Sequence, residues 1–82
     1  MRRFYFHLVE NTGRIQDFEG ALFVDDEAAL REGLRHVRHI VAHELRETGW
    51  IRLDRAIDIQ SKDGEFRHML AFSDGVSIET PT

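Results

Sequence analysis

One amphipathic stretch, residues 25–49, limits this chain to folds built around a single long helix. Asp25 is a favourable N-cap, and the acids that follow it suit the positive end of a helix dipole. Gly49 is the usual residue for ending a helix in the left-handed conformation. The apolar positions between them are spaced by three or four residues and predict one buried stripe: Leu30, Leu34, Val37, Val41 and Leu45.

The residues before this helix predict a strand hairpin. Residues 3–10 alternate so that Phe4, Phe6 and Leu8 point to one face, which is typical of a half-buried strand. The turn-forming residues 11–13 follow, and residues 14–17 can pair back as a short second strand. Gly20 breaks that pattern, and we expect residues 21–24 to lead into the helix.

A second hairpin is predicted after the helix. Residues 56–61 and 65–73 have strand patterns, and Asp63-Gly64 between them favours a two-residue type I′ turn. Residues 76–79 can extend the last strand or add a short fifth one. The order β-β-α-β-β predicts an α+β fold, an antiparallel sheet with one long helix packed on one face, in a single domain over residues 1–82.

The shared phase of these elements predicts the core. A helix of about 22 residues is about 33 Å long, whereas a seven-residue strand is about 23 Å long. We therefore expect the last turns of the helix to extend past the sheet, covered by residues 50–53 or by a second chain. The expected core consists of Phe4, Phe6, Leu8, Leu34, Val37, Val41, Ile57, Ile59, Leu70 and Phe72.

Composition narrows the functional classes. The 82 residues are 41% hydrophobic and 32% charged, which indicates a globular domain with a thin core. The chain has no cysteine, so it has neither disulfides nor thiolate metal sites. The net charge of −4 gives no overall attraction to nucleic acid. We see no signal peptide or membrane-spanning stretch, and expect a cytoplasmic protein with no membrane partner.

The sequence resembles a family of short, uncharacterised alphaproteobacterial proteins known only as a domain of unknown function. Its members open with an arginine and three aromatic residues, followed by an Ile-x-Asp-x-Glu-Gly segment, a helix rich in alanine and arginine, and a strand hairpin. His7 stands where relatives often have aspartate. The resemblance implies this fold and a bacterial cytosolic setting, and it implies no activity. The matching residues are Arg3, Phe4, Tyr5 and Phe6, then Ile15, Asp17, Glu19 and Gly20, then Asp25, Ala28 and Ala29, and lastly Asp63 and Gly64.

His36, His39 and His43 form the first candidate site. Their spacing places them along one side of the helix, and histidines at i and i+4 can bind a transition metal. The HExxH zinc signature is absent because Ile40 follows His39. We therefore expect a solvated helix face, no bound metal and no cofactor.

Asp17, Glu19 and Gly20 form the second candidate. Two carboxylates at this spacing suit acid–base chemistry or a hard cation. They suit equally a structural role, in which they accept backbone N–H groups and Gly20 takes a positive φ. We favour the structural role, since two acids do not make a catalytic constellation.

Arg31, Arg35, Arg38 and Arg46 form a basic strip along the helix. Such a strip can contact phosphates or a partner, or it can be a solvated face with internal ion pairs such as Glu27–Arg31. Because the chain is acidic, we do not favour nucleic acid as the partner.

We expect a non-enzymatic interaction protein that acts as a homodimer or through an unidentified protein. The expected contact surface is the overhanging end of the helix, the sheet face opposite it with Tyr5, Val9, Met69 and Ala71, or both. The alternative is a nucleic-acid-associated regulator of the small antitoxin type, using the arginine strip. A metal-binding protein or enzyme using the helix histidines is a third reading.

Overall fold

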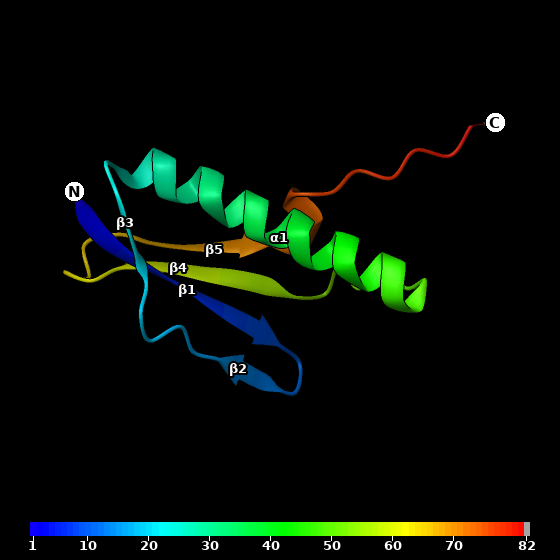
Figure 1. The fold of residues 1–82 in the computed structure, drawn as a ribbon, viewed down its shortest axis with the longest axis horizontal. Helices are drawn as coiled ribbons and strands as arrows, with labels where there is room; N and C mark the ends of the chain where they lie inside the picture. Colours follow the sequence, from blue (N-terminus) through cyan, green and yellow to red (C-terminus); the bar gives the residue numbers. More distant parts are fainter. Residues whose placement is uncertain (82) are drawn as a thin grey trace.

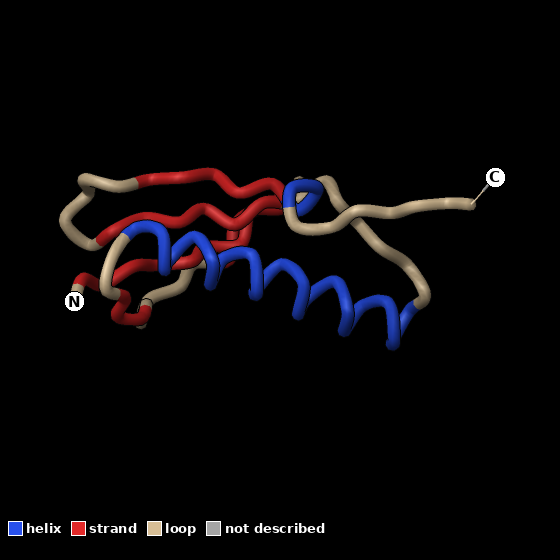
Figure 2. Tube along the Cα trace, turned by 90° about the horizontal axis from the view of Figure 1, so that it is seen from above, coloured by secondary structure: helices blue, strands red, loops and turns tan. Residues whose placement is uncertain are grey.

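The computed structural model describes residues 1–81; Thr82, the last residue of the predicted domain, lies outside the described residues. The strands form one antiparallel sheet in the order β2-β1-β4-β5, with β3 also paired to β1, and α1 lies on one face (Figures 1 and 2). The predicted α+β class is thus confirmed, with one strand more than expected. The elements are β1 (Arg2–Glu10), β2 (Gly13–Ile15), β3 (Ala21–Phe23), α1 (Asp26–Thr48), β4 (Ala56–Ser61), β5 (Arg67–Ala71) and the 3₁₀ turn η1 (Phe72–Asp74).

The additional strand is β3. β2 pairs with one end of β1, and β3 pairs with the other end of the same edge. The opposite edge of β1 pairs with β4 along most of its length. Residues 21–24 were expected only to lead into the helix, and this was wrong for residues 21–23. β2 and β3 together act as one edge strand, interrupted by the excursion at residues 16–20.

The helix begins and ends as its local sequence predicts. The Asp25 carboxylate accepts the N–H of Ala28 at 2.8 Å. Gly49 has a φ of 75° and donates its N–H to the Leu45 carbonyl. Inside the helix, a Cβ on Gly33 would lie 2.7 Å from Ile59 Cδ1. The absence of a side chain at Gly33 therefore lets α1 approach β4 closely.

The core lies between α1 and the sheet. Phe4, Phe6, Val37, Val41, Ile57, Ile59, Leu70 and Phe72 are buried as predicted, and Ala29 joins them. Leu8 and Leu34, also predicted, are partly buried and pack against this cluster. Phe4 has edge-to-face contacts with Phe23 and Phe66, so the unforeseen strand β3 contributes an aromatic ring to the core.

The second hairpin differs from the prediction in three ways. The turn is not type I′, because Gly64 is the only residue of the turn with a positive φ, and Ser61 pairs with Phe66 across residues 62–65. Asp63 Oδ1 accepts both the Ser61 hydroxyl and the Glu65 N–H, which favours this wider loop. The strand is also shorter than residues 65–73, because η1 ends it.

The third difference concerns residues 76–79, which form no strand. Arg38 Nε donates to the Gly75 carbonyl at 3.1 Å, and Gly75 lies against Val37. These contacts hold the chain against α1 after η1. The segment beyond Gly75 consequently leaves the sheet, as Figure 1 shows.

The molecule is long and thin, with extents of 46 × 27 × 18 Å. The second half of α1 continues past the ends of β4 and β5, as predicted (Figures 1 and 2). Ile51 and Leu53 pack against the core from the segment after the helix. Trp50 does not contribute to this cover, because 76% of it is exposed.

Candidate functional site

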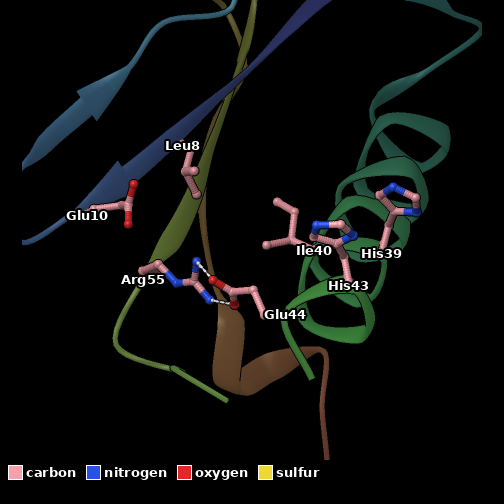
Figure 3. A pocket seen from close by; sticks show the side chains of 7 residues that line it. All are labelled: Leu8, Glu10, His39, Ile40, His43, Glu44 and Arg55. Carbon is pink, nitrogen blue, oxygen red and sulfur yellow. Dashed lines mark hydrogen bonds and ion pairs between the residues drawn. The ribbon is translucent and has the colours of Figure 1, made fainter. Parts of the chain in front are cut away.

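A pocket of about 470 Å³ lies between the end of β1 and the second half of α1 (Figure 3). The side chains around it differ in kind: some are apolar, two are histidines, and three are charged. Its lining residues are Leu8, Glu10, His39, Ile40, His43, Glu44 and Arg55.

The Arg55 guanidinium in this pocket is bound mainly to other residues of the chain. It donates two hydrogen bonds to the Glu44 carboxylate and two more to the Arg52 carbonyl. It also lies over the Phe72 ring, 4.6 Å from the ring centre, and its side chain is only 3% exposed. Arg55 therefore ties the loop after α1 to the helix, and four of its five N–H groups are engaged in doing so.

The three predicted histidines are not brought together. His39 and His43 line the pocket, whereas His36 packs against the Phe6 ring with 4.9 Å between ring centres. His36 also lies 3.8 Å from the Glu32 carboxylate. Within residues 1–81, no three histidine or acidic side chains are grouped closely enough to hold a metal ion.

The predicted arginine strip is largely engaged within the chain. Arg35 pairs with Glu32 at 3.1 Å, and Arg31 lies 3.7 Å from Glu27. Arg38 binds the Gly75 carbonyl. Arg46 is the one member that makes no ion pair or side-chain hydrogen bond among residues 1–81.

Asp17 organises the excursion between β2 and β3. Its carboxylate accepts the N–H groups of Phe6, Glu19 and Gly20, at 3.0–3.2 Å. Burial raises the pKa of Asp17, but these three backbone bonds outweigh burial and leave the pKa below its ordinary value. The Asp17 N–H in turn donates to His7 Nδ1 at 3.0 Å.

Gly20 has the positive φ that was predicted, 65°. A Cβ there would lie 2.5 Å from the Phe4 carbonyl oxygen. The Glu19 carboxylate makes no ion pair or hydrogen bond within residues 1–81, so the two acids of the motif do not converge on one site.

The sheet face opposite α1 contains a charged centre that the sequence analysis did not identify. Asp58 is completely buried on β4 and accepts hydrogen bonds from Arg14, Arg67 and Gln60. Burial raises the pKa of Asp58, but the bonds from Arg67, Arg14 and Gln60 outweigh it and lower the pKa. The only sign of this centre in the sequence is that Asp58 stands between Ile57 and Ile59, so that its side chain points to the opposite face of the strand.

An apolar groove of about 590 Å³ is lined by the overhanging end of α1 and by the segment after η1. Leu45 is 49% exposed although it shares the helical stripe of buried Val37 and Val41. Ile78, on the other side of the groove, is 65% exposed. The lining residues are Arg38, Val41, Ala42, Leu45, Ile51, Gly75, Val76, Ser77, Ile78 and Glu79.

Together, one helix on an antiparallel sheet and an open apolar groove define a small α+β protein with exposed apolar surface at one end of its helix. The chain belongs to the family described as a domain of unknown function, DUF6894, whose sequence model matches residues 3–73. The expected membership of an uncharacterised domain family is thereby confirmed. Neither the curated proteins nor the solved structures contain a match. No helix within residues 1–81 has the length and apolar character that crossing a bilayer requires.

Proposed function

We propose that this protein is a non-enzymatic interaction module that forms a homodimer through the overhanging end of α1. The observation that carries the proposal is the exposure of Leu45. This residue continues the apolar stripe of α1, yet nearly half of its surface remains in contact with solvent. Burying Leu45 and Ile78 against a second chain would remove apolar surface from water, which favours association by about 25 cal/mol per Å² before the costs of binding.

The charges around the groove support a second copy of the chain as the occupant. Arg38 and Glu79 both line it, and Arg46 lies on the same end of α1. Arg46 and Glu79 make no ion pair within residues 1–81. A two-fold axis brings each patch against its own copy, so a patch that carries both signs of charge can complement itself.

Nucleic acid binding remains the alternative, and the ion pairs of the arginine strip weigh against it. Arg31 and Arg35 each pair with a glutamate on the same helix. Phosphate contacts would have to displace these partners. Filter binding with labelled duplex DNA at 50 and 200 mM salt is the test, since phosphate contacts produce a steep salt dependence.

Trp50 provides a built-in reporter for the dimer. It is the chain's only tryptophan, it directly follows the end of α1, and it is 76% exposed in the single chain. We expect its emission to be blue-shifted at high protein concentration and to move to the red on dilution. Leu45→Asp should weaken the dimer by about a hundredfold or more and give red emission at every concentration.

Met69→Asp is the matched control for the dimer experiment. Met69 is 48% exposed, like Leu45, but lies on β5. The Trp50 emission of this variant should shift on dilution as it does in the wild type. Trp50 emission that is independent of concentration would contradict the dimer. A wild-type response from Leu45→Asp would show that the groove is not its interface.

We also infer that the protein works in a bacterial cytoplasm. The support is the resemblance of Arg3–Phe6 and Ile15–Gly20 to the corresponding segments of the alphaproteobacterial family. Fractionation of the native host, followed by immunoblotting, tests this setting. Recovery of the chain from the periplasmic or membrane fraction would contradict it.

A further inference from the structure

Phe18 is the most exposed aromatic ring in the described chain, with 85% of its surface in solvent. It lies at the centre of the excursion between β2 and β3, where the edge strand beside β1 is interrupted. We propose that Phe18 is the anchor of a second interaction surface, which docks a protein partner whose apolar pocket is rimmed by lysine or arginine. This surface is separate from the groove at the end of α1 and does not depend on the dimer.

The backbone on both sides of Phe18 is fixed. Asp17 accepts three backbone N–H groups, and its own N–H is held by His7. On the other side, Arg3 Nη1 donates to the Glu19 carbonyl at 2.6 Å. Gly20 is packed so tightly against Phe4 and Tyr5 that no side chain fits there.

This rigidity distinguishes Phe18 from an apolar residue on a loose loop. A fixed backbone has already lost the conformational entropy that docking would otherwise cost. Large aromatic side chains also dominate the binding energy of protein interfaces when they enter a pocket. Five polar contacts therefore hold in place a residue whose own side chain adds nothing to the core.

The charges around Phe18 define the chemistry of the partner. Glu19, the next residue, has a carboxylate that makes no ion pair or hydrogen bond within residues 1–81, and the Arg3 guanidinium that reaches the same residue is bound to its carbonyl oxygen. A partner with basic side chains around its pocket would be attracted and oriented by this acidic segment. Other acids of the segment are engaged within the chain, because Asp17 and Asp25 accept backbone N–H groups and Asp26 pairs with Arg2 at 2.7 Å.

The position of Phe18 leaves it free in the proposed dimer. The segment between β2 and β3 lies at the edge of the sheet, away from the second half of α1 (Figure 1). The groove is lined by that half of the helix and by residues 75–79. A dimer would therefore display two such anchors, and a partner with two pockets would bind with increased avidity.

A phage-displayed library of random peptides tests the inference on the full chain. The library is selected on immobilised wild-type protein, with the Phe18→Ser variant added in solution as a competitor. We expect the enriched peptides to combine lysine or arginine with aromatic or aliphatic residues. Their affinity should fall about tenfold or more for Phe18→Ser, and also for the charge reversal Glu19→Lys.

Two controls keep the outcomes distinct. Thermal unfolding of Phe18→Ser should match the wild type, because the ring is exposed, and Met69→Ser should leave peptide binding unchanged. The proposal would be overturned if the selected peptides bound Phe18→Ser as tightly as the wild type, or if their consensus sequence were acidic. A selection that enriched no peptide would also overturn it. Binding of the chain to phosphatidylcholine or phosphatidylglycerol vesicles that is lost in Phe18→Ser would also overturn it, in favour of a lipid surface.

Discussion

Arg14 Nη2 lies 2.5 Å from Asp58 Oδ2, although the two residues are 44 positions apart in the chain. Arg14 comes from the short, exposed strand β2, whereas the Asp58 side chain is completely buried on β4. This pair connects two strands that lie on either side of β1. Because β2 has no buried residue of its own, this ion pair is the side-chain contact that attaches β2 to the rest of the sheet.

Removing the charge of Asp58 should destabilise the fold. Asp58→Asn keeps the shape of the side chain but weakens the hydrogen bonds from Arg14 and Arg67. We expect a loss of about 1–3 kcal/mol in the free energy of unfolding. This is less than for an ion pair in which both side chains are buried, because the Arg14 and Arg67 side chains are partly exposed to water. Urea unfolding at pH 7 measures this. A loss below about 0.5 kcal/mol would mean that the pair contributes little.

Stability should also fall in acid. Folding lowers the pKa values of Asp17 and Asp58 below the ordinary aspartate value of about 3.9. A lowered pKa stabilises the folded state above the unfolded value, and that contribution is lost as the pH falls through the folded pKa. Unfolding monitored from pH 7 to pH 2 should therefore show a decline that begins near pH 4. The decline should be smaller in Asp58→Asn; an identical decline in the two proteins would contradict this origin.

Gly20→Ala should be far more damaging than the same change at Gly64. Both glycines have a positive φ, of 65° and 78°. Only Gly20 would bring its Cβ within 2.5 Å of the Phe4 carbonyl oxygen, whereas Gly64 has open space around it. We expect Gly64→Ala to cost about 1 kcal/mol and Gly20→Ala about 3 kcal/mol or more. Equal costs in thermal unfolding would show that the excursion can move to accommodate a side chain.

Val37→Ala tests the phase of the helix. Val37 is fully buried and contacts Gly75, so truncation removes apolar burial and leaves a cavity. We expect a cost of about 1–3 kcal/mol in urea unfolding. Val24→Ala is the control, since Val24 is 68% exposed and its truncation should be close to neutral. The reverse order of effects would overturn the assignment of the buried face.

The features that the sequence predicted well depend on local chemistry. Asp25 and Gly49 mark the two ends of the helix, and they could be predicted because capping acts within one turn. The spacing of the apolar residues in 4–8 and 30–41 identified the core. β3 was missed because its pairing with the start of β1 depends on a long-range contact.

Long-range contacts also explain why the sequence did not reveal the Asp58 centre or the exposure of Phe18. The partners of Asp58 come from β2 and β5, and no local pattern brings them together. The strand predicted at residues 76–79 failed because Arg38 holds the Gly75 carbonyl against α1. The exposure of Phe18 depends on how Asp17 folds the backbone around it, and neighbouring residue types do not reveal this.

Sedimentation equilibrium of the untagged wild-type chain tests the central proposal most directly. The single chain has a mass of 9.6 kDa, so a two-fold dimer has twice that mass. We predict the dimer mass at micromolar concentrations, with dissociation on dilution and a monomer for Leu45→Asp. A mass of 9.6 kDa for the wild type at every accessible concentration would contradict the homodimer.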